Sequence, residues 1–364
     1  MNLNCGIIGL PLVGKTTIFN LLTGSAAETS KYLSGRAGAN TGAAKIPDGR
    51  VDYLRDLYKP RKTTYAQMFF SDIPGLARGA GQNGGSLNQF LEAVRDADLL
   101  VHVVRAFQNP EVPHVDGEIN PRRDLDTVNA ELLLADMELV EKRIERIKSG
   151  KKIKKEQEEE LLVLEKCLLA LEGEMTVGSL VLTDEERRFL KNYSFFTVKP
   201  MILVVNTDEE QFESGRYPFR EDLVSYAAQR GFPVLEICGR LEMEISQLPL
   251  ADRKVFLSEL GVEQPGIERL ARTAYEHLGL ISFFTVGEDE LRAWTIRKGT
   301  QAKKAAGKVH SDMERGFIRA EVVKFRDLEE LGSMARVREK GLFRLEGKEY
   351  VVEDGDIINF RFNV

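Results

Sequence analysis

The sequence contains little cysteine and no long apolar run. Cys5, Cys167 and Cys238 are its three cysteines, and they are far apart along 364 residues. An odd, widely spaced set excludes a disulfide scaffold and indicates reduced thiols, as in a cytoplasmic protein. Apolar runs such as residues 200–205 are far shorter than the roughly 20 residues that span a bilayer. Residues 1–5 lack the basic and long apolar regions of a signal peptide, so we expect no membrane partner.

An excess of positive charge is also absent. The chain has 51 Lys and Arg against 57 Asp and Glu, a net charge of −6. This balance argues against a protein that coats nucleic acid or recognises a DNA sequence, although it permits a local basic face. With 43% hydrophobic and 30% charged residues, the composition is that of a globular protein, and the length favours two or three domains.

Short apolar strands alternate with helical patterns over much of the chain. The expected strands are residues 3–9, 65–71, 99–104, 200–205 and 233–237, and the expected helices include 16–23, 86–95, 220–230 and 266–278. Strict alternation predicts a doubly wound α/β sheet, with its strands covered on both faces.

Two long amphipathic segments interrupt this alternation. Apolar residues step by three and four along residues 125–139 and again along 161–171, and a lysine-rich turn at 149–155 separates them. The pattern predicts an antiparallel helical hairpin, although the two helices could instead form one more layer over the sheet. Thr183 and Glu186 then form the capping box of a further short helix.

The last 84 residues differ in character from the rest. Short β-prone runs occur at residues 283–286, 317–323, 342–345, 350–352 and 357–362. We therefore expect three parts: an α/β sheet domain formed by residues 1–122 and 199–280, a helical insertion at 123–198, and a small β-rich domain at 281–364.

A phosphate-binding loop lies at the first turn. Residues 9–16, GLPLVGKT, match G-x-x-x-x-G-K-[ST] between an expected strand and an expected helix. Backbone N–H groups and the helix N-terminus would cradle a polyphosphate, with Lys15 reaching the β- and γ-phosphates and Thr16 ligating Mg²⁺. The expected contacts of the phosphates are Leu12, Val13, Gly14, Lys15, Thr16 and Thr17.

A second motif supports this interpretation. An apolar strand ends in Asp72-Ile73-Pro74-Gly75, where Asp72 is placed to hold Mg²⁺ and the Gly75 N–H to sense the γ-phosphate. Residues 75–85 contain five glycines, a composition that suits a switch loop ordered by a triphosphate.

The base is addressed by a third motif. Guanine-specific sites use Asn-Lys-x-Asp, but here the strand ends in Asn206-Thr207-Asp208-Glu209. With Lys replaced by Thr207 and Asp by Glu209, the guanine contacts are weakened, whereas Asn206 can still pair with the N6/N7 edge of adenine. Cys238 stands where GTPases have their last base-contacting loop, so we expect its backbone near the base and its side chain in the core. We therefore favour ATP, or relaxed specificity, and keep GTP as the alternative substrate.

These motifs resemble the Obg-like ATPase (YchF) family of P-loop GTPase-class proteins, and the resemblance covers the whole chain. The family's Asn-x-x-Glu appears as Asn206 to Glu209, and residues 294–300, 316–322 and 360–364 are similar to its TGS domain, a β-grasp module. The resemblance implies a G domain with a coiled-coil insertion, ATP hydrolysis and association with the ribosome. It also implies that His114 orients the attacking water.

The chain departs from the family at three positions. Leu12 replaces an Asn that can ligate a monovalent cation, which leaves a K⁺ requirement open. Arg36 stands where the first switch has a Mg²⁺-binding Thr, for which Thr41 is a candidate substitute. Leu76 stands where Ras-like enzymes have a water-orienting Gln.

The expected partner is the ribosome. Six basic residues lie between 291 and 311 with no acid among them (Arg292, Arg297, Lys298, Lys303, Lys304 and Lys308). This TGS-like basic face and the lysines at 151–155 suit the phosphates of ribosomal RNA on the large subunit. We expect a Mg²⁺-dependent, ATP-preferring triphosphatase acting as a ribosome-associated switch. The alternatives are a GTPase and a nucleotide-gated RNA-binding module with negligible turnover.

Overall fold

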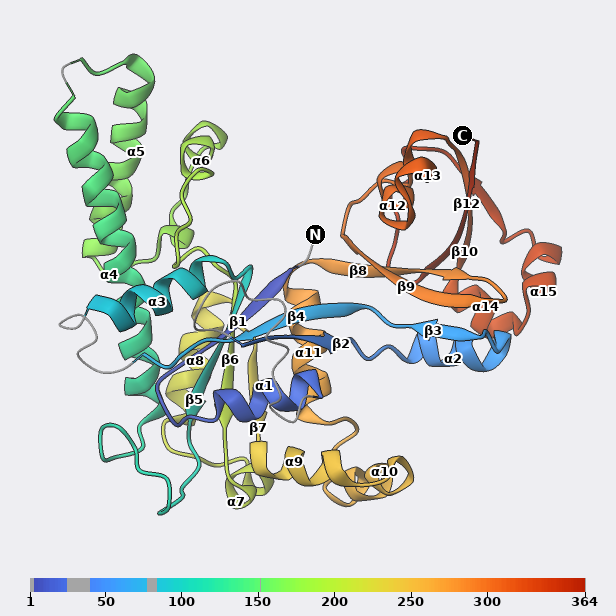
Figure 1. Ribbon diagram of the computed structural model, residues 1–364, viewed down its shortest axis with the longest axis horizontal. Coiled ribbons are helices and arrows are strands. Elements are labelled where there is room, and N and C mark those ends of the chain that lie inside the picture. Colours follow the sequence, from blue (N-terminus) through green and yellow to red (C-terminus); the bar gives the residue numbers. More distant parts are fainter. Residues whose placement is uncertain (1–2, 25–39, 77–83, 151, 364) are drawn as a thin grey trace. The chain divides into compact units, whose positions relative to one another are not determined.

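The computed structural model describes residues 3–24, 40–76, 84–150 and 152–363 (Figure 1). The chain forms two compact units, one made of residues 1–42 and 69–267 and the other of residues 43–68 and 268–364. The proposed switch residues 77–83 and the stretch containing Arg36 lie outside the described residues, as does Lys151.

The first unit is built on a six-stranded sheet with the order β2-β4-β1-β5-β6-β7. Its strands are β1 (Asn4–Ile8), β2 (Asn40–Lys45), β4 (Gln67–Asp72), β5 (Leu99–Arg105), β6 (Met201–Asn206) and β7 (Val234–Ile237). The pairs β1–β4, β1–β5, β5–β6 and β6–β7 are all parallel. Every residue of β5 and β6 is buried, which explains their uninterrupted apolar sequences. The predicted doubly wound sheet is confirmed.

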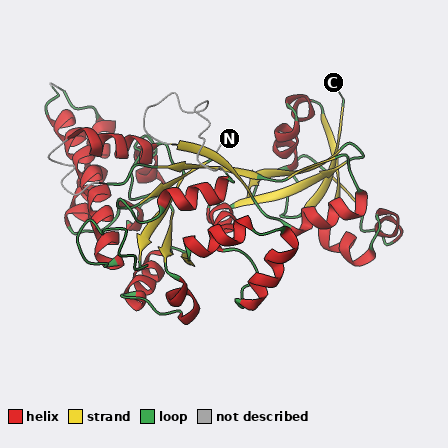
Figure 2. Cartoon of the chain, turned by 60° about the horizontal axis from the view of Figure 1, so that its bottom comes forward, coloured by secondary structure: helices red, strands yellow, loops and turns green. Residues whose placement is uncertain are grey.

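Helices lie on both sides of this sheet (Figure 2). They include α1 (Lys15–Thr23), α3 (Gly84–Arg95), α7 (Glu209–Ser214), α8 (Arg220–Arg230), α9 (Gly239–Gln247) and α10 (Leu250–Glu259), whereas most of α11 (Gly266–His277) belongs to the second unit. Because the strands are parallel, the loop after β1, Asp72 at the end of β4 and Asn206 at the end of β6 share one edge. Ligands bind at this edge in doubly wound sheets.

The two predicted amphipathic helices are α4 (Pro121–Lys148) and α5 (Lys155–Glu172), which form a hairpin (Figure 1). Their shared core contains Val140, Ile144, Val163, Leu164 and Cys167. Buried Asp136 accepts hydrogen bonds of 2.8 Å from the backbone N–H groups of Phe196 and Thr197, which tie α4 to the returning chain. A 3₁₀ turn (Val177–Ser179) and α6 (Asp184–Leu190) follow α5 along the chain. Thr183 and Glu186 form the predicted capping box of α6.

The second unit contains a mixed sheet with the order β11-β10-β12-β8-β9-β3. Its strands are β3 (Lys62–Thr64), β8 (Leu280–Val286), β9 (Glu290–Arg297), β10 (Phe317–Lys324), β11 (Arg344–Glu346) and β12 (Asp356–Phe362). Its helices are α2 (Gly49–Tyr58), α12 (Ala302–Val309), α13 (Ser311–Arg315), α14 (Phe325–Leu331) and α15 (Met334–Glu339). The alanines of α12 pack with Phe283, Ile296 and Ile358 in the core of this unit.

Residues 43–68 differ from the division expected from the sequence, because they group with the second unit. β3 pairs in parallel with β9, with Lys62 opposite Glu290. The guanidinium of Arg50 lies 2.7 Å from the carboxylate of Asp354, and Tyr53 packs edge-on against Phe325. A further difference lies at residues 350–352, where the expected strand is reduced to a single bridge between Gln301 and Val351.

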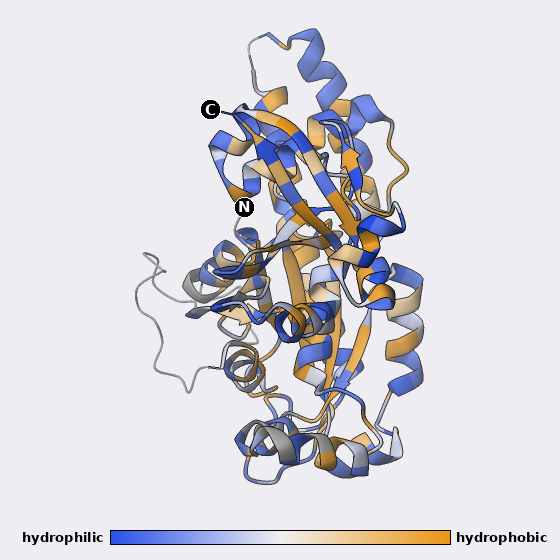
Figure 3. Ribbon diagram, turned by 90° about the vertical axis from the view of Figure 1, so that its right-hand side faces the viewer, coloured by the Kyte–Doolittle hydropathy of each residue, from blue (hydrophilic) through white to orange (hydrophobic). Residues whose placement is uncertain are grey.

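Hydrophobic residues are concentrated in the strands and on the inner sides of the helices (Figure 3). Among the helices that the structure describes, none is both long enough and apolar enough to cross a membrane.

Candidate nucleotide-binding site

The loop between β1 and α1 depends on two glycines. Gly9 and Gly14 have φ angles of 143° and 100°, which L side chains rarely adopt. A Cβ at Gly9 would lie 2.3 Å from the carbonyl oxygen of Val103, and one at Gly14 would lie 2.3 Å from Nδ2 of Asn206. Gly14 precedes α1 without a side-chain cap, so the first N–H groups of the helix are available to an anion.

Leu12 is the strained residue of this loop. Its φ is 63°, a left-handed backbone conformation that is unfavourable for leucine. The residue is 53% exposed, so burial of its apolar side chain does not offset this strain. Because Asn tolerates this conformation better than Leu, we expect Leu12→Asn to raise the free energy of unfolding by about 1 kcal/mol. Urea unfolding measures the change. Leu12→Ala retains the Cβ and is the matched control; an equal gain in both variants would contradict the strain.

Lys15 is held inside the loop. Its ammonium donates a hydrogen bond of 2.8 Å to the carbonyl of Leu10, and the residue is 7% exposed. Burial lowers the pKa of Lys15 to about 8, against the opposing effect of the Asp72 carboxylate. The charge thus lies in a partly desolvated position, where its interaction with a phosphate is stronger than in water.

Thr16 and Asp72, the two predicted Mg²⁺ ligands, lie within hydrogen-bond distance of each other. The Thr16 hydroxyl donates a hydrogen bond of 2.7 Å to Oδ2 of Asp72. Burial raises the pKa of Asp72, while the hydrogen bond from Thr16 and the charge of Lys15 lower it. A hydroxyl and a carboxylate are hard oxygen donors of the kind that Mg²⁺ prefers, so these residues fit that ion.

Gly75 approaches the phosphate-binding loop so closely that no side chain fits there. A Cβ on Gly75 would lie 2.8 Å from the backbone nitrogen of Pro11 and 2.9 Å from Nζ of Lys15. The next residue, Leu76, is 2% exposed, and its N–H donates to the carbonyl of Gly9 at 3.4 Å. Leu76 is therefore a core residue with no group that could orient water.

Asn206 links the two ends of the site. Its Nδ2 donates to the carbonyl of Val13 at 2.9 Å, and its Oδ1 accepts from the N–H of Gly239 at 3.1 Å. The predicted contact with the adenine edge would therefore use the remaining N–H of this amide. Asn206 is 5% exposed, and its two hydrogen bonds connect the phosphate-binding loop to the start of α9. It therefore stabilises the site in addition to being a candidate contact of the base.

The other base-site residues have different environments. Thr207 is 3% exposed, and its hydroxyl has no hydrogen-bond partner among the described residues. Glu209, in the first turn of α7, lies 3.4 Å from the guanidinium of Arg240. Cys238 is buried before α9, and burial raises the pKa of its thiol.

One cavity of about 1310 Å³ joins the phosphate and base ends. Its lining includes nine of the predicted residues: Leu12, Gly14, Lys15, Thr16, Thr17, Asn206, Thr207, Glu209 and Cys238. Val13 is buried beneath the loop and contributes its carbonyl to Asn206. The sequence analysis did not identify other residues of the lining, namely residues 107–109, Arg216 and Met243. The position of residues 107–109 directly after β5, at the ligand-binding edge, is the signal that could have identified them.

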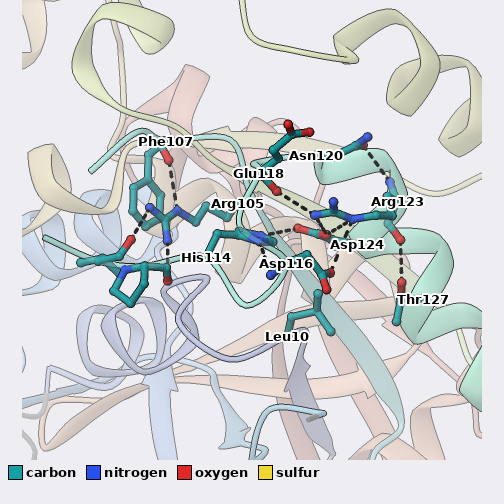
Figure 4. A network of polar contacts seen from close by, with 12 residues as sticks. Leu10, Arg105, Phe107, His114, Asp116, Glu118, Asn120, Arg123, Asp124 and Thr127 are labelled. Atoms are coloured by element: carbon teal, nitrogen blue, oxygen red, sulfur yellow. Dashed lines mark hydrogen bonds and ion pairs between the residues drawn. The ribbon is translucent and has the colours of Figure 1, made fainter. Parts of the chain in front are cut away.

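His114 does not line this cavity. Its Nε2 lies 2.8 Å from Oδ2 of Asp124, and its Nδ1 accepts from the N–H of Asp116 at 3.1 Å (Figure 4). With Nδ1 accepting, the ring proton is on Nε2 and points at Asp124. Arg123 lies 2.9 Å from Asp124 and 3.5 Å from Asp116, so it already supplies a cation to these carboxylates.

Arg105 supports the same loop from the end of β5. Its guanidinium donates to the carbonyls of Phe107 at 3.1 Å and Val112 at 2.9 Å, and lies over the Phe107 ring (Figure 4). Thr41 is the candidate replacement for the Mg²⁺-binding threonine of the first switch. Its hydroxyl forms a hydrogen bond of 2.9 Å with that of Ser71 on β4.

His102 is a buried histidine of β5 with an unusual environment. It is fully buried, and both ring nitrogens lack a partner among the described residues. Burial, and to a lesser degree the charge of Lys15, lower the pKa of His102 to about 3. The ring is therefore neutral in the folded protein at any pH near neutrality.

This histidine makes stability depend on pH. Below its ordinary pKa of 6.5, the unfolded chain protonates His102 and the folded chain does not. From pH 7 to pH 5 the folded state therefore loses about 2 kcal/mol relative to the unfolded state. We expect His102→Leu to lack this loss in urea unfolding at the two pH values, with exposed His310→Leu as the control. An undiminished loss in His102→Leu would contradict a neutral ring.

Comparison with known proteins agrees with this geometry. Residues 4–166 match a family described as a 50S ribosome-binding GTPase, and residues 280–363 match a YchF-GTPase C-terminal family described as a protein of unknown function. The chain is 43% identical over 367 residues to a ribosome-binding ATPase YchF of Bacillus subtilis and 42% identical over 365 residues to that of Haemophilus influenzae. Both alignments cover 100% of each chain.

A solved structure shows the same fold. The YchF GTPase of Schizosaccharomyces pombe is 31% identical, with a TM-score of 0.85 over 99% of this chain and 98% of that one. The phosphate-binding loop places Lys15 and Thr16 next to Asp72, and the relatives match this chain over its full length. The chain is therefore a P-loop nucleoside triphosphatase that belongs to the YchF family.

Proposed function

We propose that this protein is a Mg²⁺-dependent ATPase that prefers ATP to GTP and acts as a nucleotide-controlled switch on cytoplasmic ribosomes. The observation that carries the proposal is a cavity with Lys15 and Thr16 at one end and Asn206 and Glu209 at the other. Asp72 does not line this cavity but accepts the hydrogen bond of Thr16. A nucleoside triphosphate has both a polyphosphate and a base to fill such a cavity.

The reaction is in-line attack of water on the γ-phosphorus, with the nucleoside diphosphate as leaving group. Lys15 and the N–H groups at the start of α1 stabilise the charge that develops on the phosphoryl oxygens. Thr16 and Asp72 would hold Mg²⁺, which supplies neutralising positive charge. The close approach of Gly75 to Lys15 allows the N–H of Gly75 to contact the γ-phosphate. His114 is proposed to orient the water, a role for which the ring has to leave Asp124.

A preference for ATP follows from what the base site lacks. Guanine presents two N–H donors that an Asp after Asn-Lys accepts, whereas here Glu209 is paired with Arg240 and buried Thr207 occupies the Lys position. Competition of ATP, GTP and their diphosphates against a fluorescent nucleotide tests this preference. Tighter binding of GTP than of ATP would contradict it and support the alternative of a GTPase.

The double variant Thr207→Lys with Glu209→Asp restores the guanine motif. Since a bidentate contact discriminates between bases by roughly 1–3 kcal/mol, we expect the ratio of GTP to ATP affinity to rise about tenfold or more. The same competition assay measures the ratio, and Glu210→Asp, the adjacent acid of α7, is the control. An unchanged ratio would show that these positions do not select the base.

Association with the ribosome is supported by the relatives, which are named ribosome-binding ATPases, and by two basic surfaces. The hairpin tip exposes Lys152, Lys154 and Lys155. The basic face of the second unit exposes Arg297, Lys298, Lys303 and Lys308, while Lys304 is paired with Glu314 at 2.9 Å. We propose that both surfaces contact phosphates of ribosomal RNA on the large subunit.

Phosphate release with and without large subunits tests the switch, and co-sedimentation tests the contact. Ribosome-stimulated release and salt-sensitive co-sedimentation are expected. Absence of co-sedimentation at low salt would overturn the ribosomal part of the proposal and leave the triphosphatase intact.

A further inference from the structure

The second unit contains a cavity that the proposed nucleotide chemistry does not use. Its volume is about 420 Å³, within the range of small-molecule sites. All of its lining residues belong to residues 43–68 and 268–364, whereas the nucleotide cavity is built by the first unit. Tyr58 at the end of α2 and Met334 and Arg338 of α15 line it, together with residues of β8, β10 and β12.

Part of the lining is apolar. It consists of the side chains of Val286, Val323, Met334, Phe343 and Ile357. Burying a large aliphatic or aromatic group against such a surface is favourable by roughly 1.5–3 kcal/mol. The cavity can therefore receive one large apolar substituent.

Three polar groups of the lining have unused hydrogen-bonding or ionic capacity. The hydroxyl of Tyr58 is buried and has no partner among the described residues. Arg338 and Glu288 are both exposed, and among the residues that the structure describes neither lies within ion-pair distance of an opposite charge. Arg338 is held over the ring of Phe343, with 4.8 Å between the guanidinium carbon and the ring centre.

The other acid of the cavity is already satisfied. Glu321 is 7% exposed, accepts from Nδ2 of Asn359 at 2.8 Å and pairs with Arg361. The unpaired groups thus comprise one cation, one anion and one hydroxyl. This balance disfavours a polyphosphate, which requires an excess of positive charge, and suits a ligand that carries one charge of each sign.

We propose that this cavity binds a small zwitterion with a large apolar side chain, namely a free amino acid or a dipeptide. Arg338 pairs with its carboxylate and Glu288 with its ammonium group. The hydroxyl of Tyr58 forms a hydrogen bond with the ligand, and the apolar lining receives the side chain.

Isothermal titration calorimetry on the full chain without nucleotide tests the proposal. The probes are L-leucine, L-phenylalanine and the dipeptide Leu-Leu, with N-acetyl-leucine and leucinamide as analogues that each lack one charge. We expect a zwitterion to bind and loss of either charge to weaken binding about tenfold. Tighter binding of leucine than of Leu-Leu would indicate a free amino acid as the ligand, and the reverse order would indicate a dipeptide.

Paired variants assign the contacts. Arg338→Gln should weaken leucine binding about tenfold and leave leucinamide binding unchanged, whereas Glu288→Gln should weaken leucine and leave N-acetyl-leucine unchanged. Tyr58→Phe should weaken the zwitterions about threefold or more. Arg336→Gln, on the same helix but outside the lining, is the matched control.

Two results would overturn the proposal. One is the absence of binding by every probe at roughly 10 mM, a concentration that detects even very weak sites. The other is binding that is insensitive to Arg338→Gln, Glu288→Gln and Tyr58→Phe. Both are independent of the nucleotide site, so neither result bears on the proposed ATPase activity.

Discussion

Lys15→Ala is expected to lower the rate of ATP hydrolysis by about 10²–10³-fold. The ammonium is buried beside Asp72 and bonded to the loop carbonyl of Leu10, so contacts within the protein fix its position. Preorganised charge of this kind acts on the transition state more strongly than a mobile surface lysine does. Phosphate release under saturating ATP measures the rate, and fluorescent-nucleotide titration measures affinity, which should fall about tenfold or more.

Two further variants separate the charge from the packing of Lys15. Lys15→Met retains most of the aliphatic volume and removes the charge, so it should lose activity as Lys15→Ala does. Lys142→Ala removes a lysine whose side chain is 71% exposed on α4 and should leave hydrolysis unchanged. Unchanged nucleotide affinity in both Lys15 variants would show that the loop after β1 does not hold the phosphates.

Gly75→Ala is expected to lower hydrolysis by about 10²-fold, although it adds only a methyl group. The new Cβ would lie 2.8 Å from the nitrogen of Pro11 and 2.9 Å from Nζ of Lys15, so either the loop or the lysine has to move. The loop resists this movement because Gly9 packs on the carbonyl of Val103, and Asn206 holds Val13. Steady-state phosphate release measures the loss, and urea unfolding should show destabilisation of roughly 1–3 kcal/mol.

Gly49→Ala is the matched control for Gly75→Ala. Gly49 begins α2, and a Cβ there would meet no atom within 4 Å. This variant should retain activity and stability, because an alanine in a helix is more favourable than a glycine. Full activity of Gly75→Ala would contradict the close approach that links Asp72–Gly75 to the phosphate-binding loop.

The sequence predicts the first unit well because its buried strands are uninterrupted apolar runs and its site residues lie in motifs of fixed spacing. Uninterrupted apolar runs predict β5 and β6, and the loop glycines at 9 and 14 predict a backbone that only glycine adopts readily. The contact between Thr16 and Asp72 follows from parallel strands that end at one edge of a sheet.

Other features depend on contacts that no sequence motif records. β3 is three polar residues long, and pairing with β9 is what makes it a strand. The family resemblance predicts that His114 acts on water, whereas in the structure its ring is held by Asp124 and by the backbone of Asp116. The tie between Asn206 and Val13 spans 193 positions and has no signal in the motif itself.

The grouping of residues 43–68 with the C-terminal unit constrains how this protein can be divided. The polypeptide leaves the nucleotide-binding sheet after β2, completes the other unit with α2 and β3, and returns through β4. A single cut near residue 280 would strip β9 of its neighbour β3 and Asp354 of its partner Arg50. A fragment that begins near residue 280 would therefore lack part of its own sheet and core, so we expect it to be less stable than the second unit of the full chain.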